Sequence, residues 1–105
     1  MVNARPGDSD VSDSPPDIRM TMWVHGHVQG VGFRWWTRAR ALELHLVGSA
    51  RNLSDGRVEV VAQGPEVVCR GLLALLRNGD TPGRVDVVVE LVGVPKGPIT
   101  GFVER

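Results

Sequence analysis

The ten residues His25–Arg34, which read His-Gly-His-Val-Gln-Gly-Val-Gly-Phe-Arg, separate two segments with different hydrophobic periods. Before them, Met20, Met22 and Val24 alternate with more polar residues, as in a half-buried strand. After them, Phe33–Leu44 repeats apolar residues at helical spacing. A strand therefore leads into a helix through a loop that holds three glycines within seven residues.

The composition of this loop favours an anion site. It contains no acidic residue and ends in Arg34, whose guanidinium carries a fixed charge and a planar fork of donors. A glycine-rich turn at a helix start can direct several main-chain N–H groups at one anion. The glycines alone are more typical of a tight turn that needs positive φ, and their spacing matches no nucleotide-binding signature. The arginine, the absence of acids and the helix start together indicate an oxyanion site, most simply for phosphate.

The pattern continues outward from the loop as alternating strands and helices. The segments after the first helix are a strand over Leu46–Leu53, a Ser54-Asp55-Gly56 turn, a strand over Arg57–Gln63, a helix opened by Gly64-Pro65-Glu66 and stopped by Asn78-Gly79-Asp80, a strand over Arg84–Leu91, and a short edge strand over Ile99–Glu104. The order β-α-β-β-α-β predicts an α+β fold, a two-layer ferredoxin-like sandwich. Its sheet is expected to be antiparallel, with both helices on one face because the crossovers are right-handed.

Composition limits the remaining possibilities. The 105 residues suit one domain, and the formal net charge of zero gives no sign of a nucleic-acid or membrane partner. One cysteine, Cys69, is typical of a reducing cytoplasm and of a core position. Residues 1–17 are rich in Asp, Ser and Pro, so we expect a disordered tail before a domain over residues 18–105.

Two blocks of the sequence are similar to the signature segments of the acylphosphatase family. The first is Gly26–Arg34; the second runs from Ala41 and ends in Arg51–Gly64, or Arg-Asn-Leu-Ser-Asp-Gly-Arg-Val-Glu-Val-Val-Ala-Gln-Gly. The resemblance covers essentially everything after the tail. It implies a small cytosolic hydrolase that splits acyl phosphates into a carboxylate and inorganic phosphate. It also implies that Arg34 is the catalytic, phosphate-binding arginine and that Asn52 positions the attacking water.

The residues themselves fit these roles. We expect Arg34 to bind the phosphoryl oxygens together with the main-chain N–H groups of His27, Val28, Gln29, Gly30, Val31 and Gly32. Asn52 is in phase with Gly48 and Ala50, which directs it to the face covered by the first helix. From the residues alone, Asn52 would rather be interpreted as a capping residue beside the turn.

Three residues at two places depart from the family pattern. His45 stands where the family commonly has glycine, and Ser49-Ala50 stand where it commonly has an aromatic residue and a valine. Histidine tolerates left-handed geometry better than most residues, so we expect a small cost at His45. Ser49 removes an aromatic residue from its strand. We expect these changes to affect local packing and stability rather than the chemistry.

The alternatives to a hydrolase are a binding module and a domain that acts with a larger enzyme. The same fold serves RNA-binding modules, but the strand over Arg57–Gln63 offers no aromatic residue for its open face. A non-catalytic phosphate- or acyl-phosphate-binding module stays open, as does a domain that acts with a larger enzyme. His25 and His27 lack an evident third ligand, so we expect no metal and no cofactor. The expected partners are a small acyl phosphate and inorganic phosphate, as product and competitive inhibitor, with no nucleic acid and no membrane; the protein is expected to be a monomer.

Overall fold

The computed structural model describes residues 16–105, which form five strands and two helices. In chain order these are β1 (Asp17–His27), α2 (Phe33–Glu43), β2 (Val47–Asn52), β3 (Val58–Pro65), α3 (Glu66–Asn78), β4 (Arg84–Gly93) and β5 (Phe102–Glu104). The predicted order of elements is confirmed, and the bounds differ from the predicted ones by a few residues at most. Residues 1–15 of the predicted tail lie outside the described residues, while Asp17 already pairs with Pro65 in the sheet.

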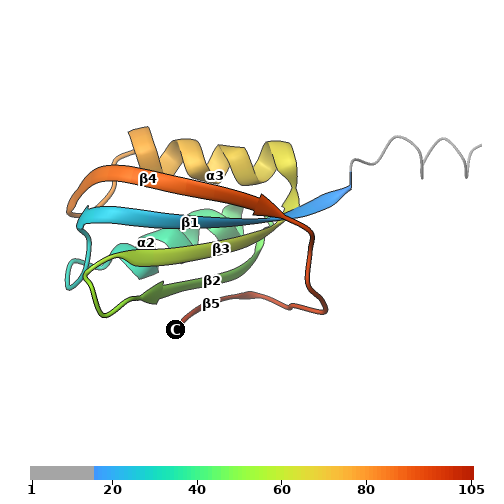
Figure 1. The fold of residues 1–105 in the computed structure, drawn as a ribbon, viewed down its shortest axis with the longest axis horizontal. Coiled ribbons are helices and arrows are strands. Elements are labelled where there is room, and N and C mark those ends of the chain that lie inside the picture. Colours follow the sequence, from blue (N-terminus) through green and yellow to red (C-terminus); the bar gives the residue numbers. More distant parts are fainter. Residues whose placement is uncertain (1–15) are drawn as a thin grey trace, which may run out of the picture.

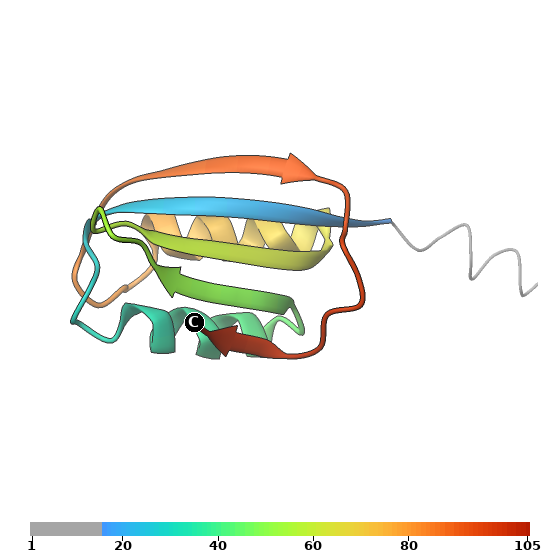
Figure 2. The same ribbon diagram turned by 60° about the horizontal axis from the view of Figure 1, so that its bottom comes forward.

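One sheet in the order β4-β1-β3-β2-β5 forms the first layer, and both helices pack on the same face of it (Figure 1). The pairs β1–β4, β1–β3 and β2–β3 are antiparallel, as expected for this sandwich. The edge strand differs from the prediction of an antiparallel sheet, because β5 pairs with β2 in parallel and makes the sheet mixed. The reason is the chain direction: β4 runs opposite to β2, so a chain that turns back after β4 enters beside β2 in the same direction as β2. Figure 2 shows β5 running along β2 on the side of the molecule that carries α2.

The core lies between the sheet and the helices. Met20, Met22 and Val24 alternate onto the helix side of β1 and are fully buried. They meet the apolar stripe of α3, whose buried residues are Cys69, Leu72, Leu73 and Leu76. Each fully buried aliphatic side chain of this kind contributes roughly 1.5–3 kcal/mol to folding. The alternation and the helical stripe seen in the sequence are thus the two halves of one hydrophobic core.

The opposite face of the sheet carries several polar pairs beside the exposed apolar side chains of Val87, Val89 and Leu91. The Trp23 indole donates to the Glu59 carboxylate at 3.1 Å, and Arg51 forms an ion pair with the same carboxylate at 2.9 Å. Arg19 donates to the Gln63 side chain at 3.1 Å. Trp23 is the only aromatic residue that β1, β3 and β4 place on this face, so the row of stacking rings typical of RNA-binding modules is missing from the described sheet.

The two departures from the family pattern occupy defined places. His45 follows the last turn of α2 with φ of 60°, the left-handed conformation that its position predicts. Ser49 is almost buried in β2 and lies beside an open hollow of about 210 Å³ that Val61 and Val103 also line. Within residues 16–105, no helix is long and apolar enough to cross a membrane.

Candidate active site

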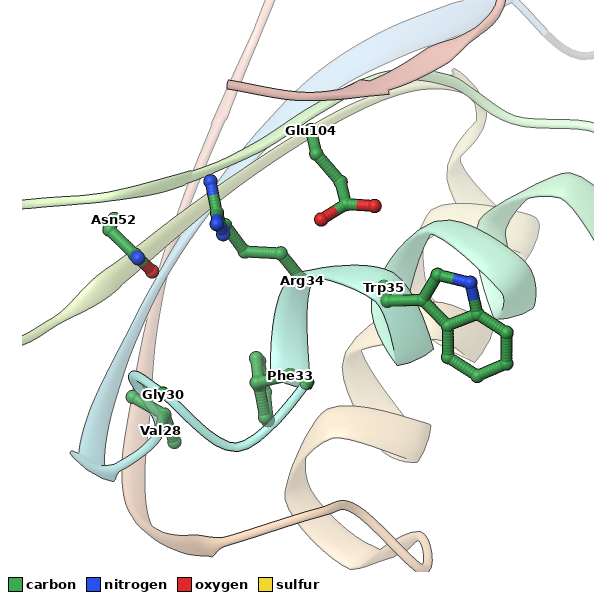
Figure 3. A pocket seen from close by; sticks show the side chains of 8 residues that line it. Val28, Gly30, Phe33, Arg34, Trp35, Asn52 and Glu104 are labelled. Atoms are coloured by element: carbon green, nitrogen blue, oxygen red, sulfur yellow. The ribbon is translucent and has the colours of Figure 1, made fainter.

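A small pocket lies where the β1–α2 loop, the start of α2, the end of β2 and β5 meet (Figure 3). Its volume is about 100 Å³. The residues that line it are Val28, Gly30, Gly32, Phe33, Arg34, Trp35, Asn52 and Glu104. The glycine-rich loop therefore faces the end of β2, and two segments that are separate in the sequence share one cavity.

The loop takes its shape from glycines in the left-handed region. Gly30 and Gly32 have φ of 75° and 82°, values that residues with a side chain rarely adopt. A Cβ at either position would meet no neighbour, so the backbone conformation and not the space requires glycine there. Gly26, with φ of 142°, belongs instead to a β-bulge against β4, where a Cβ would overlap the main-chain oxygen of Arg84. The positive φ values expected from the sequence are confirmed, and two of the three glycines shape the wall of the pocket.

The first turn of α2 has main-chain donors available for an anion. Gly32 caps the helix without a side-chain hydrogen bond, and no acidic residue stands in the first turn of α2. The first intrahelical bond runs from the Trp36 N–H to the Gly32 oxygen at 3.0 Å. The N–H groups of Phe33, Arg34 and Trp35 precede it and have no acceptor within the helix. These donors and the positive end of the helix dipole favour a bound anion.

The Gln29 side chain fastens the loop to the β2–β3 turn. Its amide nitrogen donates to the main-chain oxygens of Leu53 at 2.7 Å and Arg57 at 3.0 Å. Asp55 closes the same turn by accepting from the Arg57 N–H at 3.1 Å and from its guanidinium at 2.8 Å. The hydrogen bond from the Arg57 N–H lowers the pKa of Asp55, which suits a turn residue. These contacts set the distance between the glycine loop and Asn52.

Arg34 lies across the pocket from the helix side. Its Nη1 donates to the main-chain oxygen of Arg105 at 2.7 Å, and its guanidinium extends between Asn52 and Glu104 (Figure 3). One turn further along α2, Arg38 donates to the main-chain oxygen of Phe102 at 2.9 Å. The two arginines therefore fasten β5 to α2, but only Arg34 lines the pocket.

The acylphosphatase family model matches residues 20–103, a range that includes the loop, Asn52 and nearly all of the described fold. The chain belongs to the acylphosphatase family. An acylphosphatase of Thermobifida fusca is 67% identical over 88 residues, covering 84% of this chain and 97% of the relative. One of Nocardia farcinica is 59% identical over 100 residues, which is 90% of this chain and the whole of the relative. The crystal structure of acylphosphatase from Bacillus subtilis superposes with a TM-score of 0.78 at 30% identity, covering 84% of this chain and 98% of that one.

The pocket of this acylphosphatase-family chain is lined by some, but not all, of the predicted site residues. Val28, Gly30, Gly32, Arg34 and Asn52 meet at the pocket, as the sequence predicts. His27, Gln29 and Val31 are not among the lining residues: His27 ends β1 opposite Arg84, the Gln29 side chain is bonded to the turn, and Val31 lines a neighbouring groove. That their main-chain N–H groups hold phosphate stays a prediction. Trp35 lines the pocket and is largely exposed, whereas Trp36 is partly buried against the core.

Glu104 is the one charged residue of the pocket that sequence reasoning missed. It stands on β5 and reaches the pocket only because β5 pairs with β2. Among the described residues, no hydrogen bond or ion pair engages its carboxylate. No local pattern around Glu104 indicates a site, so only the tertiary structure reveals it. The side chains that line the pocket thus contribute one positive and one negative charge.

Neither the cysteine nor a metal cluster supplies further chemistry within the described residues. Cys69 is buried in the core, and this desolvation raises the pKa of its thiol to about 11, so it is not a nucleophile. Within residues 16–105, no three His, Cys, Asp or Glu side chains gather closely enough to hold a metal ion. The groups that the pocket offers for chemistry are Arg34, the main-chain N–H groups, the Asn52 amide and the Glu104 carboxylate.

Proposed function

We propose that this protein hydrolyses the carboxyl–phosphate bond of acyl phosphates to a carboxylate and inorganic phosphate. The observation that carries this proposal is the meeting of Arg34, the uncapped start of α2 and Asn52 at one pocket. Arg34 and the N–H donors match the phosphoryl oxygens, while the Asn52 amide faces the same cavity from β2. The sequence-based roles of Arg34 and Asn52 are thus compatible with one bound phosphoryl group.

The reaction needs positioning more than acid–base chemistry. A water oxygen attacks phosphorus, the bond between phosphorus and the acyl oxygen breaks, and its electron pair leaves with the carboxylate. The carboxylate is a stable leaving group, so it departs without a general acid, and the water proton passes to a phosphate oxygen. Arg34 and the helix start stabilise the equatorial oxygens, and the Asn52 amide orients the water.

The proposal extends to the mode of inhibition by phosphate, the cellular location and the oligomeric state. Inorganic phosphate is expected to inhibit competitively, because product and substrate share the group that the pocket recognises. The single cysteine, which is buried and unpaired, suits the reducing cytoplasm that we propose as the location. We also propose that the protein acts as a monomer, since all the groups named above come from one chain.

Hydrolysis of acetyl phosphate by the purified protein is the direct test. We expect turnover that a divalent-metal chelator does not change, because Arg34 supplies the positive charge at the phosphoryl group. Release of inorganic phosphate is measured with and without chelator. Loss of activity with chelator and its recovery on adding a metal would contradict this mechanism. Phosphate binding without any turnover would instead favour the non-catalytic module.

Glu104→Gln is expected to tighten inhibition by inorganic phosphate. The substitution removes a negative charge that shares the pocket with Arg34. Because the carboxylate is solvent-exposed, we expect the inhibition constant to fall by only about two- to fivefold. The measurement is the phosphate inhibition constant at low and high ionic strength, since screening should reduce the difference.

Glu43→Gln is the matched control for this prediction. Glu43 is an exposed carboxylate at the far end of α2, paired with Arg40 at 2.9 Å and outside the pocket. Removing its charge alters net charge by the same amount and should leave phosphate inhibition unchanged. An equal effect of both substitutions would show that net charge, and not the place of Glu104, governs phosphate binding.

A further inference from the structure

A second hollow adjoins the phosphate pocket on the other side of Trp35. It has a volume of about 380 Å³, and its walls are Trp35 and Trp36 on α2 and the α3–β4 loop over residues 80–82. Gly32 and Trp35 line both this hollow and the phosphate pocket. We call it the Trp35 groove. The two cavities therefore share part of one wall, and a group attached to a phosphate in the pocket lies next to the groove.

The exposure of Trp35 is not explained by folding. The side chain is 63% exposed, whereas its neighbour Trp36 packs against the core with its ring centroid 6.2 Å from that of Phe33. An aromatic ring left largely in water contributes little to the core. An exposed ring next to a binding pocket is instead suited to cover a flat apolar part of a ligand.

The in-line geometry of phosphoryl transfer also favours the Trp35 groove as the site of the acyl group. In phosphoryl transfer the attacking and leaving oxygens lie roughly in line through phosphorus. Figure 3 shows Asn52 and Trp35 on opposite sides of Arg34. If Asn52 orients the water, the acyl group leaves on the side of the phosphoryl group away from Asn52; Trp35, where the groove begins, also lies on the side of Arg34 away from Asn52.

We infer that the Trp35 groove binds the acyl group of the substrate and selects acyl phosphates with a flat, apolar and uncharged acyl part. This inference rests on the proposed hydrolase function. Trp35 supplies one ring face, and Pro82 lies in the opposing loop. The carboxylates of Asp80 in the groove and Glu104 in the pocket disfavour a second negative charge on the substrate.

The test compares benzoyl phosphate, which carries a flat ring, with acetyl phosphate, which carries only a methyl group. For Trp35→Ala we expect the ratio of the two kcat/KM values, benzoyl over acetyl, to fall about five- to tenfold, the range of one aromatic contact. Trp35→Phe keeps a ring face and should restore most of the ratio. A side chain that only maintains the fold would lower both kcat/KM values together and leave their ratio unchanged.

Leu42→Ala is the matched control, because Leu42 is also an exposed apolar residue of α2, 41% exposed, at the end remote from the pocket. It should change neither kcat/KM value. An unchanged ratio in Trp35→Ala, with both substrates still hydrolysed, would overturn the assignment of the groove while leaving the hydrolase function intact. Failure of the wild-type protein to hydrolyse either substrate would overturn the proposed function, and the groove assignment with it.

Discussion

Arg34→Ala is expected to lower kcat/KM for acyl phosphate hydrolysis by about 10³-fold or more, the scale of an arginine that stabilises a phosphoryl transition state. The same substitution should weaken inhibition by inorganic phosphate, because Arg34 contacts the phosphoryl group in the ground state and in the transition state alike. Both losses are measured on one preparation, by steady-state kinetics with phosphate as inhibitor.

Arg38→Ala separates this effect from a loosening of β5. Arg34 and Arg38 both donate from α2 to main-chain oxygens at the C-terminal end of the chain, at 2.7 and 2.9 Å, but Arg38 does not line the pocket. We expect Arg38→Ala to retain most of the activity. If both variants lose activity to the same extent, the role of Arg34 is to hold β5 in place.

Arg34→Lys tests the geometry of the charge. Lysine keeps the positive charge but presents it as a point, without the planar fork that matches two phosphate oxygens. We therefore expect Arg34→Lys to recover some phosphate binding while kcat stays far below that of the wild type. Full recovery of kcat would show that charge alone is needed at this position.

Asn52→Ala is expected to lower kcat by about 10²-fold, the scale for removal of a positioned polar catalytic group. Phosphate inhibition should be nearly unchanged, because the amide acts on the water and not on the phosphoryl oxygens. A loss in kcat with preserved binding is the signature of an interaction made in the transition state. The measurement is kcat together with the phosphate inhibition constant.

Two controls accompany the Asn52 variant. Circular dichroism and thermal unfolding establish that it is folded, which its exposed place at the end of β2 leads us to expect. Asn78→Ala removes an exposed asparagine from the end of α3, outside the pocket, and should leave kcat unchanged. Near-normal kcat in Asn52→Ala would make Asn52 a residue of the turn and leave the water without its proposed partner.

Much of the fold was predictable because its signals are local. Alternation in Met20–Val24, the apolar stripe of α3 and the Ser54-Asp55-Gly56 turn each arise from residues that are close in sequence. The mixed sheet was not predictable from β5 itself, because three residues carry no mark of the strand with which they pair. The direction of β5 follows from its pairing with β2, because β2 offers a free sheet edge after the other strands have paired.

The features of the candidate site were also predictable only where they depend on residues close in sequence. The Gly30 and Gly32 conformations, the acid-free start of α2 and the presence of Arg34 are properties of one short segment. The place of Asn52 beside that segment depends on tertiary contacts, among them the hydrogen bonds from Gln29 to the turn, which join residues that the sequence separates widely.

The sequence by itself determined the glycine loop, the helix that follows it and the order of strands, because φ preferences and hydrophobic periods act over a few residues. Only the tertiary structure decided that Glu104 enters the phosphate pocket and that the α3–β4 loop faces Trp35 to form a groove. Those contacts join segments far apart in the chain, and they form only where strand pairing and helix packing bring the segments together.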